Sequence, residues 1–326
     1  MSKELKFKTL GISIPTYKRP DYLKKCILSA IEDAGNIPVK IFIVDDSLSD
    51  VNKRVIDELT AKWDFIFYKS NAVNMGIDDN IQEAIDFCAC DYSWVIGEDD
   101  IFLPGSIKRI YDFIQPNDYD FIYSNYQFAN EDHSVFLHPA IADVEEGRMQ
   151  TTDFIEKYLW TIGFIGACVI KKEAWDRTSP AAYKGTYYTH VGRIVNIIAK
   201  HHSIYISRQP NVANRAQGAD TFTWKKDSFG VFTGFEKMCR IAGNNDKSIQ
   251  IPMLKAAKGY RNKIGYLSVK TLLRLRAESS YDYDQFKKYI AHLDTSSIKR
   301  ACFYLISIVP SYFLKPLVYL HGKMNK

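Results

Sequence analysis

The stretch Tyr92-Ser93-Trp94-Val95-Ile96-Gly97-Glu98-Asp99-Asp100 joins an apolar run to three consecutive acidic residues. The apolar run predicts a buried strand, and carboxylates at the end of such a strand repel one another and lose contact with water. A divalent cation that lies among them and also holds a diphosphate offsets that cost. The stretch therefore predicts a metal site for a phosphorylated sugar or nucleotide. The alternative is a turn whose acids cap the helix expected from Pro104 to about Ile114.

Strand and helix patterns alternate along the first 125 residues. Short apolar runs predict strands at 10–14, 39–44, 65–68 and 92–96, and helical periodicity marks 21–34, 51–62 and 77–88. This alternation is typical of an α/β fold, in which a mostly parallel sheet carries helices on both faces. Open sheets of this kind bind ligands beyond the carboxyl ends of their strands.

Polar residues gather at those carboxyl ends. The four predicted strands run into Pro15-Thr16-Tyr17-Lys18-Arg19, Asp45-Asp46-Ser47, Asn71-Ala72-Val73-Asn74 and Glu98-Asp99-Asp100. Separate segments thus place polar groups on one rim of the sheet, which favours a ligand site over a simple helix cap. Beyond residue 119 a hairpin and a further buried strand at 166–170 are expected, and from about residue 223 the pattern is mostly helical. We therefore expect a catalytic sheet domain at 1–220 and a helical region at 221–326.

Composition and charge exclude several classes of protein. The chain of 326 residues is 46% hydrophobic and 25% charged, as is typical of a globular protein. The six cysteines form no CxxC pair, so a zinc clasp is not expected, and the first residues show no apolar leader. We therefore expect a cytosolic protein.

The net charge of +5 is confined to the carboxyl-terminal tail. Residues 296–326 contain five basic side chains and no acid, which argues against a nucleic-acid-binding surface spread over the fold. Its longest uncharged run, Ala301–Leu314, contains Pro310 and is shorter than the roughly 20 residues that span a bilayer. The tail is therefore predicted to lie in the membrane interface, held by basic and aromatic side chains. The alternative is a pair of helices that close the core.

With these residues, the chain resembles the GT-A glycosyltransferases of family 2, which take a sugar from a nucleotide-diphosphate donor. The resemblance covers about residues 8–125 and rests on the order and spacing of Ile12–Arg19, Val44–Ser47, Asn74–Gly76 and Gly97–Asp100. It implies a Rossmann-like GT-A fold. A second stretch, Phe164–Trp175 followed by Tyr183–Val191, resembles the abequosyltransferase-like branch, whose members build bacterial O-antigen or capsule repeat units on an isoprenoid-diphosphate lipid.

The resemblance implies a role for each residue of the nucleotide pocket. Asp46 would hold the edge of the nucleobase, and Tyr17 would pack beside the base in a pocket shaped by Pro15 and Thr16. Ordinary turn chemistry is the alternative for Asp46 and Tyr17. Asn74 belongs to the third matching motif and is also expected to contact the donor.

The resemblance also implies a cation, Mg²⁺ or Mn²⁺, that offsets the charge of the leaving nucleoside diphosphate. Asp100 lies where the family ligates this metal, and Asp99 lies where it contacts the metal or the ribose. Glu98 stands where an Asp or a small residue is commoner, so its role on the donor side is open. Arg19 would reach the diphosphate or, alternatively, pair with Asp21.

His190 occupies the position at which many family members carry an Asp that deprotonates the acceptor hydroxyl. An imidazole can take that proton at cytosolic pH. A metal ligand on the diphosphate side and a helix-capping or core histidine are the alternatives. The change from Asp leaves open whether transfer inverts or retains the anomeric configuration.

The leading hypothesis is a metal-dependent transferase that adds one sugar to a lipid-linked oligosaccharide at the inner face of the bacterial cytoplasmic membrane. The absence of a Gln-x-x-Arg-Trp element argues against a processive synthase. The departures at Glu98 and His190 motivate an alternative, a non-catalytic module that binds nucleotide-sugars on the same fold. A dehydrogenase is disfavoured because no G-x-G-x-x-G follows the first strand.

Overall fold

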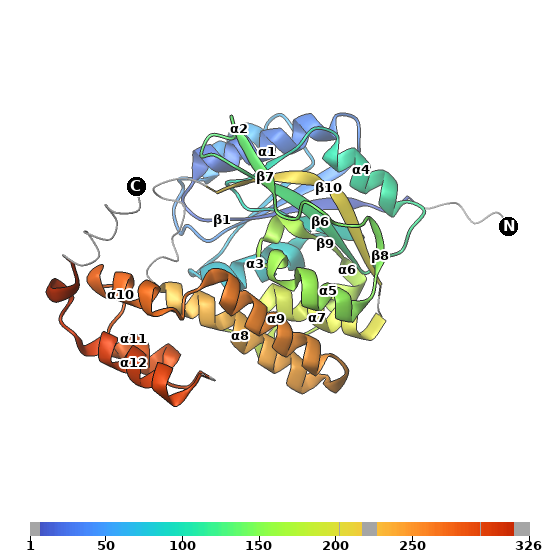
Figure 1. Cartoon of the computed structure of the whole chain (residues 1–326). Coiled ribbons are helices and arrows are strands. Elements are labelled where there is room, and N and C mark those ends of the chain that lie inside the picture. The colour runs from blue at the N-terminus through green and yellow to red at the C-terminus, as the bar shows by residue number, and fades with distance from the viewer. Residues whose placement is uncertain (1–6, 202, 217–226, 294, 316–326) are drawn as a thin grey trace.

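A ten-stranded sheet forms the centre of the computed structural model, which describes residues 7–201, 203–216, 227–293 and 295–315 (Figure 1). The strand order is β3-β2-β1-β4-β9-β6-β10-β5, with β7 paired to β6 and β8 paired to β10. The strands are β1 (Leu10–Thr16), β2 (Val39–Asp45), β3 (Ile66–Ser70), β4 (Tyr92–Val95), β5 (Ile101–Phe102), β6 (Phe121–Ala129), β7 (Phe136–Pro139), β8 (Gly147–Met149), β9 (Cys168–Lys171) and β10 (Ile204–Arg215).

The half of the sheet formed by β3, β2, β1 and β4 is parallel throughout. Ile12 of β1 lies opposite Ile41 on one side and Trp94 on the other. Nearly all residues of β1 and β4 are buried, as expected for parallel strands that are covered on both faces. The fold class predicted from the alternating pattern, including the helical carboxyl-terminal region, is confirmed.

The second half of the sheet is mixed. β9 is antiparallel to β4 and to β6, whereas β10 is parallel to β6. The register between β10 and β6 shifts between Ser207 and Val212, and Val212 then pairs with Phe102 of the short strand β5. This pairing brings the end of β10 beside the residues that follow β4.

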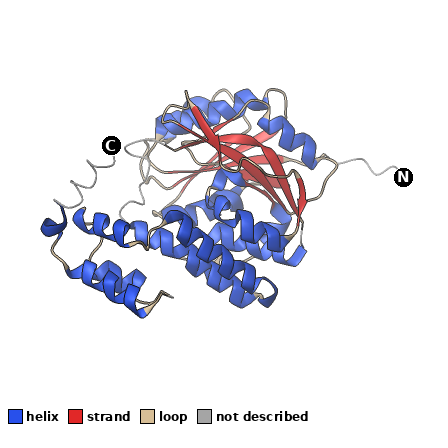
Figure 2. Cartoon of the chain, viewed as in Figure 1, coloured by secondary structure: helices blue, strands red, loops and turns tan. Residues whose placement is uncertain are grey.

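Helices cover both faces of the sheet (Figures 1 and 2). One face carries α1 (Pro20–Ala34), α2 (Lys53–Thr60) and α4 (Ser106–Ile114), which lie above the sheet in Figure 1. The other carries α3 (Gly76–Phe87), α5 (Thr151–Tyr158) and α7 (Thr189–His201), and the short α6 (Lys172–Asp176) follows β9.

The carboxyl-terminal helices divide between two hydrophobic cores. α8 (Ser228–Asn245) and α9 (Gln250–Ile264) share the core of the sheet, to which Phe235, Met238 and Met253 contribute. α10 (Val269–Ala277), α11 (Tyr283–Gln285) and α12 (Ser297–Ile308) pack around a smaller second core. The boundary expected near residue 220 stays a prediction, and two helices that follow it are packed as part of the sheet domain. The end of the predicted membrane-associating tail, residues 316–326, lies outside the described residues.

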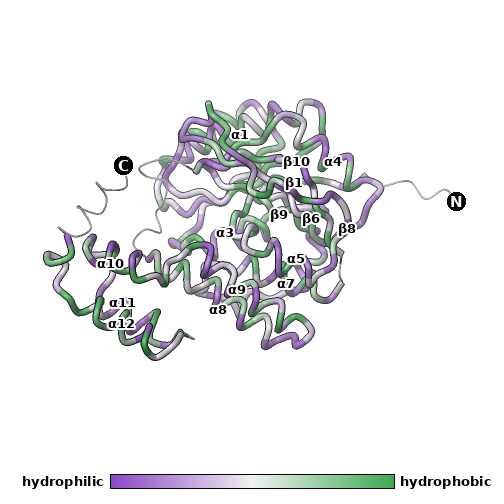
Figure 3. Tube along the Cα trace, in the orientation of Figure 1, coloured by the Kyte–Doolittle hydropathy of each residue, from purple (hydrophilic) through white to green (hydrophobic). Residues whose placement is uncertain are grey.

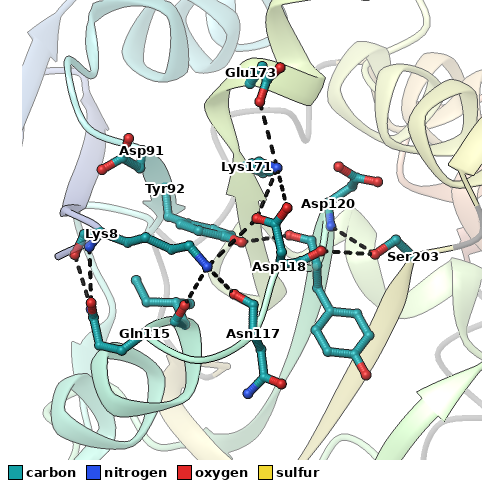
Figure 4. Close-up of polar contacts among 12 residues, drawn as sticks. Lys8, Asp91, Tyr92, Gln115, Asn117, Asp118, Asp120, Lys171, Glu173 and Ser203 are labelled. Atoms are coloured by element: carbon teal, nitrogen blue, oxygen red, sulfur yellow. Dashed lines mark hydrogen bonds and ion pairs between the residues drawn. The ribbon is translucent and has the colours of Figure 1, made fainter. Parts of the chain in front are cut away.

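A polar cluster lies at the amino ends of the parallel strands β1 and β4 (Figure 4). Lys8 Nζ donates to the backbone oxygens of Ile114 and Asn117, at 3.1 and 2.5 Å. Lys171 Nζ bonds Asp118 at 2.9 Å, and Tyr92 OH donates to a backbone carbonyl at 2.9 Å. Both lysines of this cluster thus have acidic or carbonyl partners within the protein.

Among the helices that the structure describes, none has both the length and the apolar character needed to cross a bilayer.

Gly234 tests the packing of α8 against the sheet domain. A Cβ at this position would overlap the backbone oxygen of Thr186, so Gly234→Ala is expected to lower the free energy of unfolding by about 2 kcal/mol. Gly259 of α9 is the matched control, because a Cβ added there would have no atom within 4 Å. Alanine also has a higher helix propensity than glycine. Gly259→Ala should raise the free energy of unfolding by roughly 0.5–1 kcal/mol. Urea unfolding measures both, and equal effects would contradict the described contact.

Candidate functional site

The three acids after β4 lie in three different environments. Glu98 points back toward β1, where it accepts hydrogen bonds from Thr16 Oγ1 and, at 2.9 Å, from the backbone N–H of Tyr17. Burial raises the pKa of Glu98 to about 8, although these bonds and Arg19 act in the opposite direction. Glu98 therefore ties β4 to β1.

Asp99 is held by two arginines. Its Oδ2 accepts from Arg19 NH1 at 2.9 Å and from Arg215, at 2.7 Å from NH2 and 3.2 Å from Nε. Arg19 thus lies beside the acids, within reach of the place where a diphosphate is predicted. Arg215 comes from the end of β10, and the local sequence gave no sign of its role.

Asp100 is buried, with 3% of its surface exposed. Its Oδ1 accepts from the backbone N–H of Arg215 at 3.0 Å and from Asn214 Nδ2 at 3.1 Å. Burial, together with the charge of Asp99, raises the pKa of Asp100 well above its usual range. A nearby positive charge would favour the ionised form of this carboxyl group.

The remaining oxygens of Asp99 and Asp100 converge above Gly97. A Cβ at Gly97 would lie 2.7 Å from Asp100 Oδ2 and 3.3 Å from Asp99 Oδ1, so a side chain at this position would crowd both carboxylates. Neither oxygen accepts a hydrogen bond from a described residue. Mg²⁺ is commonly bound by one or two carboxylates together with substrate phosphates. Among the described residues no group of three or more His, Cys, Asp or Glu side chains could hold a metal, so Asp99 and Asp100 fit a divalent cation only with ligands from a substrate.

Asp46 and Asn74 lie together at the start of α3. The carboxylate of Asp46 accepts from the backbone N–H groups of Met75 and Gly76 at 2.8 and 2.9 Å, and from Asn71 Nδ2 at 3.1 Å. Asn74 Nδ2 donates to the backbone oxygen of Asp46 at 3.2 Å. These contacts order the loop that precedes α3. A role for Asp46 at the nucleobase stays a prediction.

The residues that end β1 divide between the interior and the surface. Pro15 lies in the sheet opposite Val44, and the buried Thr16 accepts from Asn52 Nδ2 at 3.1 Å. Tyr17 is 38% exposed, so its ring is available to pack against a base.

His190 is buried rather than displayed on the rim. It is 3% exposed, and its Nε2 lies 3.0 Å from the backbone oxygen of Ile162. Its Nδ1 is enclosed without a hydrogen-bond partner among the described residues. Burial lowers the pKa of His190 to about 4, so the imidazole is neutral near pH 7. Its role as a base stays a prediction.

A carboxylate from another element caps the helix on which His190 lies. Asp78 of α3 accepts from the backbone N–H of Thr189 at 3.0 Å and from its Oγ1 at 2.6 Å. Burial raises the pKa of Asp78, although both hydrogen bonds oppose the shift. The sequence gave no signal for this contact, because the two residues are 111 positions apart.

Comparisons with known proteins identify the family of this chain. The model of Glycosyl transferase family 2 matches residues 12–178. Abequosyltransferase RfbV of Salmonella typhimurium is 25% identical over 196 residues, or 56% of this chain and 59% of that protein. This chain thus spans about three fifths of the length of that relative. Glycosyltransferase GlyG of Streptococcus pneumoniae serotype 4 is 20% identical over 273 residues, or 79% of this chain and 89% of that protein.

Solved structures of S. aureus TarS share the fold. TarS 1-349 superposes with a TM-score of 0.60 at 11% identity, covering 96% of this chain and 92% of that chain. The same fragment in complex with UDP gives a TM-score of 0.61 at 11% identity.

The burial of His190 predicts a specific pH dependence of stability. Because its folded pKa of about 4 lies below that of an unfolded histidine, the unfolded chain binds the proton first as the pH falls. His190 should therefore lower the free energy of unfolding by about 2 kcal/mol between pH 8 and pH 5. His190→Gln should lose that part of the pH dependence in urea unfolding. His138→Gln, which changes an exposed ring, should keep it. Identical pH profiles for wild type and His190→Gln would contradict the burial.

Proposed function

The chain belongs to glycosyltransferase family 2, and on this premise we propose that it moves one sugar from a nucleotide-diphosphate sugar to a lipid-linked oligosaccharide, with the help of a divalent cation. The observation that carries the proposal is the convergence of Asp99 Oδ1 and Asp100 Oδ2 above Gly97, next to Arg19. Two carboxylates and a guanidinium at the carboxyl edge of a sheet suit a cation and a diphosphate.

The relatives support the class of donor and acceptor. TarS has been crystallised with UDP and with UDP-GlcNAc, which makes a nucleotide-diphosphate sugar the proposed donor here. RfbV is named an abequosyltransferase, and its similarity supports placing this chain in the abequosyltransferase-like branch. We therefore propose an acceptor carried on an isoprenoid lipid and a place in the assembly of a surface polysaccharide.

Six residues of the site have a proposed task in this reaction. Asp99 and Asp100 hold the cation, which when bound stabilises the negative charge of the leaving nucleoside diphosphate. Arg19 contacts the diphosphate, and Tyr17 packs beside the base that Asp46 helps to position. His190 is proposed as the base for the acceptor hydroxyl on its position in the matching stretch alone, since its 3% exposure fits the alternative of a core histidine.

The outer face of α12 supports a peripheral membrane contact. Phe303 and Ile306 face the second core, whereas Ile298, Leu305 and Ile308 are 84%, 57% and 46% exposed. Hydrophobic and hydrophilic segments alternate along this helix (Figure 3). The helix thus closes a core on one side, as the alternative for the tail expected, and leaves an apolar stripe on the other. We propose that this stripe and the nearby basic residues place the protein on the cytoplasmic face of the membrane.

Asp100→Asn tests the proposed transfer. Asparagine keeps an oxygen for the Arg215 and Asn214 contacts but removes the charge that the cation requires, so turnover should fall at least about 100-fold while the fold stays intact. The donor for the assay is the nucleotide-sugar that raises the melting temperature most in the presence of Mn²⁺. Asp118→Asn, at the opposite end of the sheet, should keep wild-type turnover. Unchanged transfer by Asp100→Asn would reject the metal role.

Leu305→Glu tests the membrane contact. Moving one leucine from the bilayer interface to water should weaken binding to anionic phospholipid vesicles roughly tenfold in a sedimentation assay. Leu254→Glu, which alters a leucine on α9 that is 51% exposed against 57% for Leu305, is the matched control and should bind as wild type does. Equal binding by all three proteins would contradict the proposed surface.

A further inference from the structure

Arg215 is joined to both acids of the proposed cation site. It is the last residue of β10, and its backbone N–H donates to Asp100 Oδ1 at 3.0 Å. Its guanidinium donates to Asp99 Oδ2 at 2.7 and 3.2 Å. One residue thus contacts Asp99 through its side chain and Asp100 through its backbone.

The guanidinium of Arg215 is enclosed and supported. Its side chain is 1% exposed, whereas that of Asp99 is 20% exposed. The ring of Tyr22 lies 4.3 Å from the guanidinium carbon, in a cation–π contact that fixes its plane. Such an enclosed charge needs an anionic partner at all times, because an unpaired buried guanidinium is strongly unfavourable.

The two carboxylate oxygens of Asp99 have different surroundings. Its Oδ2 is shared by Arg19 and Arg215, whereas its Oδ1 turns toward Asp100 Oδ2 above Gly97. A cation at the Oδ1 side competes with both guanidinium groups for the same carboxylate. A diphosphate at the same place offers the arginines new oxygens, with the geometry that the guanidinium fork matches.

We propose that Arg215 is a diphosphate-binding residue that exchanges Asp99 for the donor's phosphate oxygens when the donor and the cation bind. This inference rests on the proposed function. In the free protein Arg215 neutralises Asp99, and in the donor complex it stabilises the charge of the leaving group. Arg215 then opposes the binding of a cation alone and favours the binding of a diphosphate.

The exchange predicts that Arg215→Gln changes the affinities for Mn²⁺ and for UDP in opposite directions. Without the competing guanidinium, Mn²⁺ alone should bind severalfold more tightly, as followed by electron paramagnetic resonance. With Mn²⁺ saturating, UDP should bind about 10- to 100-fold more weakly in calorimetry, because a charge-assisted contact is lost. The affinity for UMP, which lacks the second phosphate, should fall less than the affinity for UDP.

Two further variants separate this role from general damage to the site. Arg208→Gln removes the same charge from an exposed position on β10 and should change neither affinity. Arg215→Lys keeps the charge and should restore part of the affinity for UDP. Melting temperatures establish that each variant is folded.

Three results would overturn the inference. Weaker binding of both Mn²⁺ and UDP by Arg215→Gln would show a structural role, and unchanged binding of both would show no role at the site. A wild-type protein that binds neither Mn²⁺ nor any of UDP, GDP, CDP or dTDP would refute the proposed function, and the inference with it. Wild-type binding combined with an unaffected Arg215→Gln variant would refute the inference alone.

Discussion

The rest of the site depends on how the protein offsets the negative charge of two neighbouring carboxyl groups, Asp99 and Asp100. Two adjacent carboxyl groups lie at the end of a buried strand, where water cannot solvate them fully. The protein holds one oxygen of each through arginine and asparagine donors, whereas the other oxygen of each lies beside Gly97 with no hydrogen bond from a described residue. This division fixes the carboxylates in place while keeping two oxygens available to a cation.

The topology of the sheet makes this arrangement possible. The parallel strands β1, β2 and β4 end at one edge, so Thr16, Asp46 and the acids after β4 arrive there together. The pairing of β10 with β5 then returns the chain to the same edge and delivers Arg215. At the opposite ends of these strands, Lys8 contacts the backbone oxygen of Asn117 and the carboxylate of Asp118.

Sequence patterns predicted the parallel half of the sheet, because each of its strands is a local apolar run followed by polar residues. They also predicted which residues would gather at the rim. They could not predict Arg215, which lies 115 residues after Asp100 and reaches it only through the strand order β6-β10-β5. The sequence left a core position open as one alternative for His190 but could not select it, since the contact depends on the carbonyl of Ile162 in a segment that the helical pattern does not include. Asp46 was predicted as a ligand-binding group, and its contacts with Met75 and Gly76 add a local task that spacing alone does not reveal.

A crystal structure of the protein soaked with Mn²⁺ and the nucleoside diphosphate that stabilises it most tests the cation site directly. We expect an anomalous peak for manganese between Asp99 Oδ1 and Asp100 Oδ2, with oxygens of the diphosphate completing its coordination. A nucleotide bound elsewhere, or bound at this edge with no manganese near either carboxylate, would contradict the assignment of the two acids and the sugar transfer proposed from it.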